Sequence, residues 1–196
     1  MAVARARPRA LRAHAAVPSR GRSLDSAGVR RVVVWIAVVI TSLLLQSTVF
    51  AQIQLGGAKP DLIYLITVVL AYLEGPSSGA LAGFAGGMAE DFLLNQPKGI
   101  TALTLTLVGY SIGMARQYIV SPSPLLPVFL VGGATAGGFL FFGLVRFLLN
   151  QPVGGFGELL RVALLAAAYN AVLTPILFPV VRRVAESSRT PRAFRW

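Results

Sequence analysis

The sequence predicts an all-α integral membrane protein, a bundle of six transmembrane helices. The first observation is composition: of 196 residues, 55% are hydrophobic and only 13% are charged, with a mean hydropathy of +0.70. Soluble domains carry about 25% charged residues. The second is a series of long apolar runs between short polar or Pro/Gly-containing segments. The third is a concentration of arginine at both ends, which is typical of cytoplasmic flanks of membrane spans.

The lengths of the apolar runs give the number of spans. A bilayer core of about 30 Å needs about 20 helical residues. Five runs meet this requirement, and the remaining one, residues 62–73, crosses only if Pro60, Asp61 and Glu74 lie in the interfaces. Pro60 suits a first helical turn, and Asp61 suits the positive end of that helix. The six spans are placed at residues 32–50, 60–74, 77–94, 100–119, 125–149 and 157–181.

The arginines predict the topology. Eight lie in residues 1–31 and five in residues 182–196, so both tails are expected on the cytoplasmic side of the inner membrane, which requires an even number of spans. The first tail reads as disordered, and no cleavage motif separates it from the first span. Both tails are expected to bind anionic lipids. Nucleic-acid binding is not expected, because no nucleic-acid-binding motif accompanies the basic residues.

A nine-residue motif occurs twice. Residues 91–99 read DFLLNQPKG and residues 146–154 read RFLLNQPVG, at the predicted ends of the third and fifth spans. The Asn and Pro residues suit helix exits. Because charges inside a membrane usually find partners, we hypothesise that Asp91 and Arg146 pair across these two helices. Alternatively, Arg146 reaches the headgroups and Asp91 meets water.

Glycines recur every four residues, which places them on one helix face and allows close helix packing. On this basis the third span is expected to be the central helix, and packing inside the bundle is favoured over packing against a partner. The glycines are Gly75, Gly79, Gly83 and Gly87, then Gly109 with Gly113, and Gly133 with Gly137.

The last span combines Asn170, Thr174 and Pro175. A proline inside a helix frees a backbone carbonyl and bends the helix, and Asn or Thr side chains can satisfy the freed group. Local repair of this kind is favoured over a ligand cavity lined by the same residues.

Catalytic motifs are missing. A G-x-S-x-G string at residues 75–79 lacks a histidine partner, because the single histidine, His14, lies in the first tail. Glu90 and Asp91 are adjacent, which is poor geometry for a two-carboxylate site on one helix face. No enzyme activity, cofactor or metal is therefore expected.

One stretch resembles a known family. Residues 59–113 combine a PDL opening of a short span, a Gly-rich segment ending in Asp-Phe-Leu, a Pro-Gly turn and an A-L-T-L-T-L-V-G-Y helix. Together with the closing YNAVLTPILFPVVRRV at residues 169–184, these features resemble the rod shape-determining membrane protein MreD family. The long Arg-rich first tail goes beyond the family pattern.

The resemblance implies a non-enzymatic scaffold of the bacterial cell-wall elongation machinery. Its implied partner is MreC, together with MreB, RodA and a class B penicillin-binding transpeptidase. The implied fold is similar to the six-helix substrate-binding component of energy-coupling factor transporters. That likeness supplies an alternative, a membrane subunit that binds a small molecule, with possible ligands at Gln46, Glu90, Asp91, Tyr110, Asn170 and Thr174. A proton-coupled carrier that uses Asp91 is a third possibility.

Overall fold

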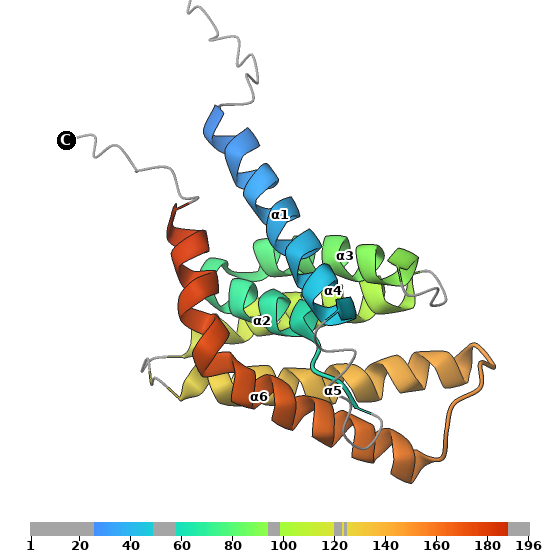
Figure 1. Cartoon of the computed structure of the whole chain (residues 1–196). Coiled ribbons are helices and arrows are strands. Elements are labelled where there is room, and N and C mark those ends of the chain that lie inside the picture. Colours follow the sequence, from blue (N-terminus) through green and yellow to red (C-terminus); the bar gives the residue numbers. More distant parts are fainter. Residues whose placement is uncertain (1–25, 49–57, 94–98, 120–122, 124, 188–196) are drawn as a thin grey trace, which may run out of the picture.

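The computed structural model describes residues 26–48, 58–93, 99–119, 123 and 125–187. In this part of the chain there are six α-helices and one 3-10 helix (Figure 1). Their bounds are α1 Ser26–Thr48, α2 Leu62–Glu74, α3 Pro76–Leu93, α4 Ile100–Ala115, η1 Arg116–Tyr118, α5 Leu126–Leu148 and α6 Phe156–Ser187. Most of the two predicted tails and Asn95 of the repeated motif lie outside the described residues.

The six helices confirm the predicted all-α class, and each coincides with one predicted span. The helices exceed the spans at the two ends, because α1 begins at Ser26 rather than at residue 32, and α6 continues past residue 181 to Ser187. Residues 26–31, predicted as part of a disordered tail, are therefore helical. The segment contains no Pro, and its single Gly did not stop the helix. Two helices, α5 and α6, are long and apolar enough to cross a membrane.

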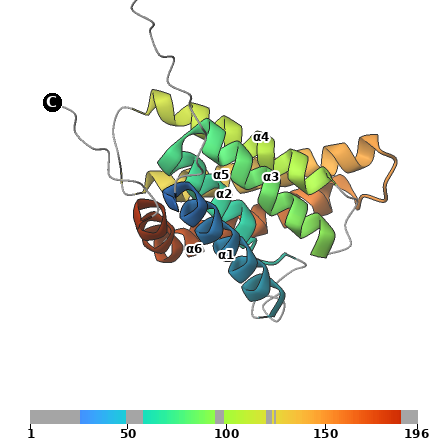
Figure 2. The ribbon, with the colours of Figure 1, turned by 90° about the horizontal axis from the view of Figure 1, so that it is seen from above.

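Helix α2 occupies the centre of the structure. The α3–α4 pair and the α5–α6 pair each form an antiparallel hairpin, and α2 contacts both hairpins as well as α1 (Figures 1 and 2). Ten consecutive residues of α2, from Leu62 to Ala71, are buried. The prediction that the third span is central was wrong. Helix α3 buries its glycine face and exposes Leu81 and Phe84 on another, whereas α2 is apolar on every side.

The predicted glycine packing is found between α3 and α4. A Cβ atom on Gly79 would lie 2.6 Å from the carbonyl oxygen of Gly109, and one on Gly83 would meet the carbonyl of Leu105. A Cβ on Gly87 would lie 2.6 Å from the Cα of Ala102. A Cβ on Gly113 would overlap the backbone of Pro76 in the same way. The two backbones therefore touch along most of their length, which only glycine permits.

Three other glycines do not serve this purpose. Gly75 lies between α2 and α3 at φ 100°, a conformation that other residues rarely adopt, and nothing lies within 4 Å of its Cβ position. Gly133 and Gly137 also have open space there, so their four-residue spacing does not mark a contact within the bundle. The closest glycine contacts of α5 are instead made by Gly138, against the ring of Tyr64, and by Gly143, against the side chain of Leu159.

Helix α6 changes direction along its length, as Figure 1 shows. Pro175 and Pro179 both lie inside the helix. Each lacks the N–H group that would bond to the carbonyl four residues earlier, which explains the bend.

We expect Gly83→Ala to destabilise the protein by about 1–3 kcal/mol, because the new methyl group would overlap the α4 backbone. The measurement is thermal unfolding in mild detergent. Gly133→Ala is the matched control, since its Cβ meets open space and alanine favours a helix. Equal destabilisation by the two changes would contradict the packing account.

Candidate functional site

Polar side chains converge on the start of α2. A helix leaves its first four backbone N–H groups without partners in the helix, and at the start of α2 these groups are buried. Asp61 precedes the helix, and its Oδ1 atom accepts hydrogen bonds from the N–H groups of Ile63 and Tyr64, both at 3.1 Å. The prediction that Asp61 suits this helix end is confirmed. Pro60 lies before this cap rather than in the first helical turn.

Gln46 of α1 satisfies the third N–H group. Its Oε1 accepts from the backbone N–H of Leu62 at 3.2 Å, and its Nε2 donates to Oε1 of Glu90 on α3 at 3.0 Å. Gln46 and Glu90 are both buried, with exposed fractions of 3% and 4%. One side chain thus joins α1, α2 and α3.

Asn170 of α6 accepts from the fourth backbone N–H group, that of Asp61. Its Oδ1 accepts from the N–H of Asp61 at 3.0 Å, and its Nδ2 donates to Oγ1 of Thr135 on α5 at 3.1 Å. Asn170 and Thr135 are fully buried. Asn170 was predicted to repair the proline defect, but its side chain is used between helices. Thr174, one turn along α6, donates instead to the Asn170 carbonyl at 2.6 Å.

We refer to Gln46, Asp61, Glu90, Thr135 and Asn170 as the α2 cap network. Sequence reasoning identified Asp61 as a helix-start residue and Asn170 as a buried polar group, but assigned no such role to the others. The feature of the sequence that could have revealed this network was the short length of α2. A 13-residue helix is only about 20 Å long, so one end was bound to lie inside the bundle and to need acceptors there.

Asp91 has a different role from the predicted one. Its Oδ2 accepts from the backbone N–H of Gly99 at 2.7 Å and from that of Ala102 at 3.3 Å. Gly99 is the residue before α4 and has no side chain with which to cap the helix. Asp91 therefore caps α4 from the end of α3, which closes the α3–α4 hairpin.

Arg146 performs the corresponding task in the other hairpin. Its Nη2 donates to the carbonyl of Pro152 at 3.1 Å, and its guanidinium lies 5.7 Å from the centre of the Phe142 ring. The predicted pair between Asp91 and Arg146 is not formed, because each side chain binds the connection that follows its own helix. In both copies of the motif the charged first residue thus binds the backbone of the turn.

The second copy also ends its helix as the sequence predicts. Asn150 adopts φ 55°, the N–H of Asn150 bonds to the Phe147 carbonyl at 3.0 Å, and that of Gln151 bonds to the Arg146 carbonyl at 2.9 Å. These two bonds and the left-handed residue define a Schellman motif.

Two carboxylate oxygens, Glu90 Oε2 and Asp91 Oδ1, are buried with no hydrogen-bond partner among the described residues. The two side chains take different sides of α3, since Glu90 binds Gln46 and Asp91 binds the start of α4. They therefore do not form the paired acid and base of a hydrolytic site. In the described ranges, no group of three or more His, Cys, Asp or Glu residues is placed to hold a metal ion.

The comparison with protein families decides the identity. The model of the family described as rod shape-determining protein MreD matches residues 27–186, which include nearly the whole of all six helices. The chain belongs to the MreD family. Comparisons with curated proteins and with solved structures gave no significant match.

The family match confirms the resemblance noted from the sequence and makes this chain a membrane protein of rod-shape determination. The α2 cap network and the Asp91 cap both lie within the matched residues. Both sets of bonds hold helices together: the α2 cap network joins α1, α3, α5 and α6 to the start of α2, and Asp91 joins α3 to α4.

We expect Asn170→Leu to lower stability by about 1–3 kcal/mol, because the buried N–H of Asp61 loses its acceptor while the side chain keeps its number of heavy atoms and its branch at Cγ. Thermal unfolding in detergent measures the loss. Ser111→Ala on the exposed face of α4 serves as the control. An Asn170→Leu variant as stable as this control would show that the cap network is dispensable.

A double-mutant cycle tests the roles of the two charged residues. Asp91→Ala should cost about 0.5–2 kcal/mol, the usual value for a lost helix cap. The coupling energy between Asp91→Ala and Arg146→Ala should stay below about 0.5 kcal/mol, because the residues share no partner.

Gln46→Ala with Glu90→Ala is the positive control for this cycle, since these side chains are hydrogen-bonded and should couple by more than about 0.5 kcal/mol. A larger coupling for Asp91 and Arg146 than for this pair would restore the ion-pair hypothesis.

Proposed function

We propose that this MreD family member is a non-catalytic scaffold of the cell-wall elongation machinery in the inner membrane of a rod-shaped bacterium. In this proposal it assembles with MreC and, through the same machinery, with MreB, RodA and a class B penicillin-binding transpeptidase. The observation that carries the proposal is the match to the rod shape-determining MreD model over residues 27–186.

The internal bonding supports a scaffold. Five of the six side chains considered as ligands for a small molecule are buried, and each of Gln46, Glu90, Asp91, Asn170 and Thr174 already bonds within the protein. The sixth, Tyr110, is half-exposed on α4. Only Thr174 among these six lines one of the two cavities described below, and its hydroxyl is already bonded to the Asn170 carbonyl. Because a small-molecule site needs several polar groups that converge on a cavity, this arrangement favours a rigid bundle over a transporter subunit.

The proposed topology has six spans with both termini in the cytoplasm. The helix order supports it, because the end of α2, the start of α3, the end of α4 and the start of α5 lie toward one end of the bundle (Figure 1). The short second span is accommodated because α2 is enclosed by other helices rather than by lipid, and its buried start is satisfied by the α2 cap network. The basic tails would then face anionic lipid.

The outer surfaces of the bundle are apolar and available for lipid or partner helices. On α1 the exposed residues Val33, Ile36, Ile40 and Leu44 follow a three-to-four residue spacing, which forms one continuous stripe. A scaffold needs such surfaces and no reactive group, since assembly within a membrane depends on close packing between helices.

Affinity purification of the tagged full chain from native membranes tests the proposal. MreC and the elongation synthase should be recovered with the wild-type protein. Asp91→Ala should reduce the recovery because it loosens the α3–α4 hairpin, whereas Arg183→Ala, on the exposed end of α6, should not.

Recovery of an ATPase module or a bound vitamin in place of MreC would contradict the scaffold and support the transporter subunit. Equal MreC recovery with Asp91→Ala and Arg183→Ala would support the assembly with MreC but would show that Asp91 is not needed for it.

A further inference from the structure

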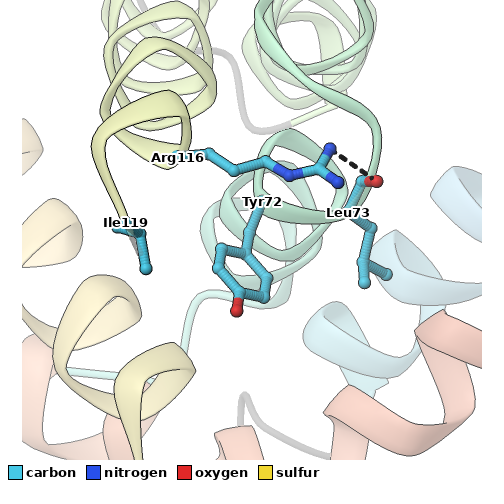
Figure 3. A pocket seen from close by; sticks show the side chains of 4 residues that line it. All are labelled: Tyr72, Leu73, Arg116 and Ile119. Carbon is cyan, nitrogen blue, oxygen red and sulfur yellow. Dashed lines mark hydrogen bonds between the residues drawn. The ribbon is translucent and has the colours of Figure 1, made fainter. Parts of the chain in front are cut away.

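The end of α2 opposite the α2 cap network borders two open cavities that the scaffold role does not use. One has a volume of about 240 Å³ and is lined by Tyr72, Leu73, Arg116 and Ile119 (Figure 3). The other has a volume of about 520 Å³ and shares Tyr72 and Leu73 with the first. The remaining residues that line the larger cavity are Ser123, Pro127, Val128, Thr174, Pro175, Phe178 and Arg182.

Each cavity contains one arginine. Arg116 follows α4, and its Nη1 donates to the Leu73 carbonyl at 2.8 Å, which fixes the guanidinium at the end of α2 (Figure 3). Arg182 on α6 uses its Nε to bond Oε1 of Glu186 at 2.8 Å. The Nη2 of Arg116 and both Nη atoms of Arg182 make no hydrogen bond with any described residue. Both arginines therefore keep donors available to a ligand.

Tyr72 lines both cavities and so belongs to the surroundings of each arginine. Its ring centre is 6.3 Å from that of Phe178, and its hydroxyl makes no hydrogen bond within the described residues. Pro127, Val128 and Phe178 make much of the larger cavity apolar. The two cavities thus combine cationic donors with an apolar wall, a combination that suits an amphiphilic anion.

The position in the membrane selects the type of anion. In the proposed topology, on which this step rests, the end of α2 lies in the cytoplasmic half of the bilayer. Basic pockets between transmembrane helices on this side bind lipid headgroups. Guanidinium groups bind phosphate with two parallel N–H donors, and the apolar wall matches an acyl chain.

We propose that these two cavities form one site for an anionic phospholipid. The phosphate is bound by Arg116 and Arg182 with the Tyr72 hydroxyl, and an acyl chain lies along Pro127, Val128 and Phe178. Glu186 keeps its bond to Nε of Arg182, so the phosphate uses the Nη donors. A bound lipid would fill the space between α2, α5 and the bent part of α6.

Native mass spectrometry of the full-length protein tests the site. The protein is purified in mild detergent and washed at high salt, which removes lipid held only by the basic tails. Wild type should retain one phosphatidylglycerol or cardiolipin molecule, identified by its mass. The double variant Arg116→Ala/Arg182→Ala should retain at least about tenfold less, because it loses the charge-assisted bonds.

Arg161→Ala/Arg183→Ala is the matched control, because it removes the same charge from two arginines that are exposed like Arg116 and Arg182 but line neither cavity. Val128→Trp is a second variant that fills the apolar part without changing charge, and it should also reduce retention. Thermal unfolding of each variant shows that the bundle is intact.

Equal loss of lipid in the two double variants would overturn the site, as would undiminished retention in Arg116→Ala/Arg182→Ala. Retention of zwitterionic phosphatidylethanolamine at the same level would also overturn it, because the arginines would then have no role in selection. A mass corresponding to free phosphate alone would reject the lipid. None of these outcomes depends on MreC, so they are independent of the scaffold proposal.

Discussion

The start of α2 lies inside the protein, so its first four backbone N–H groups must find acceptors in the side chains around it. Three side chains provide them: Asp61 binds two of the groups, and Gln46 and Asn170 bind one each. An unpaired backbone group inside a membrane costs several kcal/mol, so these acceptors are a condition for the short helix to exist at this depth. Because they come from α1, from the segment before α2 and from α6, the same condition determines where those elements lie.

The two hairpins around α2 are built differently. The α3 and α4 backbones touch through glycines, and Asp91 closes their connection by capping α4. The α5–α6 hairpin relies on larger side chains, a Schellman motif and the bond from Arg146 to the Pro152 carbonyl. The repeated motif therefore marks two turns with one shared principle, in which a charged side chain of the preceding helix binds the turn backbone. A carboxylate suits free N–H groups and a guanidinium suits free carbonyls.

These constraints separate the interior of the molecule from its surface. The polar groups of the interior are used to hold helices together, whereas the surface is largely apolar, with long exposed side chains on α1, α3 and α5. A protein of this kind can present a fixed shape to lipids and partner helices, which supports the scaffold role proposed for this MreD family member. The cavities beside Tyr72 are different, because their arginines keep unused donors at the opposite end of α2.

The sequence by itself determined the six helices and most of their bounds, because apolar run length and Pro/Gly punctuation act locally. It also determined the glycine face of α3, since a four-residue spacing defines one side of a helix, and the Asp61 cap, since a cap acts within its own turn. That this glycine face packs against α4 was decided by the tertiary structure. Only the tertiary structure decided that α2 is central, that Asn170 binds Asp61 and Thr135, and that Asp91 and Arg146 do not pair. These facts depend on which helices become neighbours, and the spacing of residues along one chain does not specify neighbours between helices.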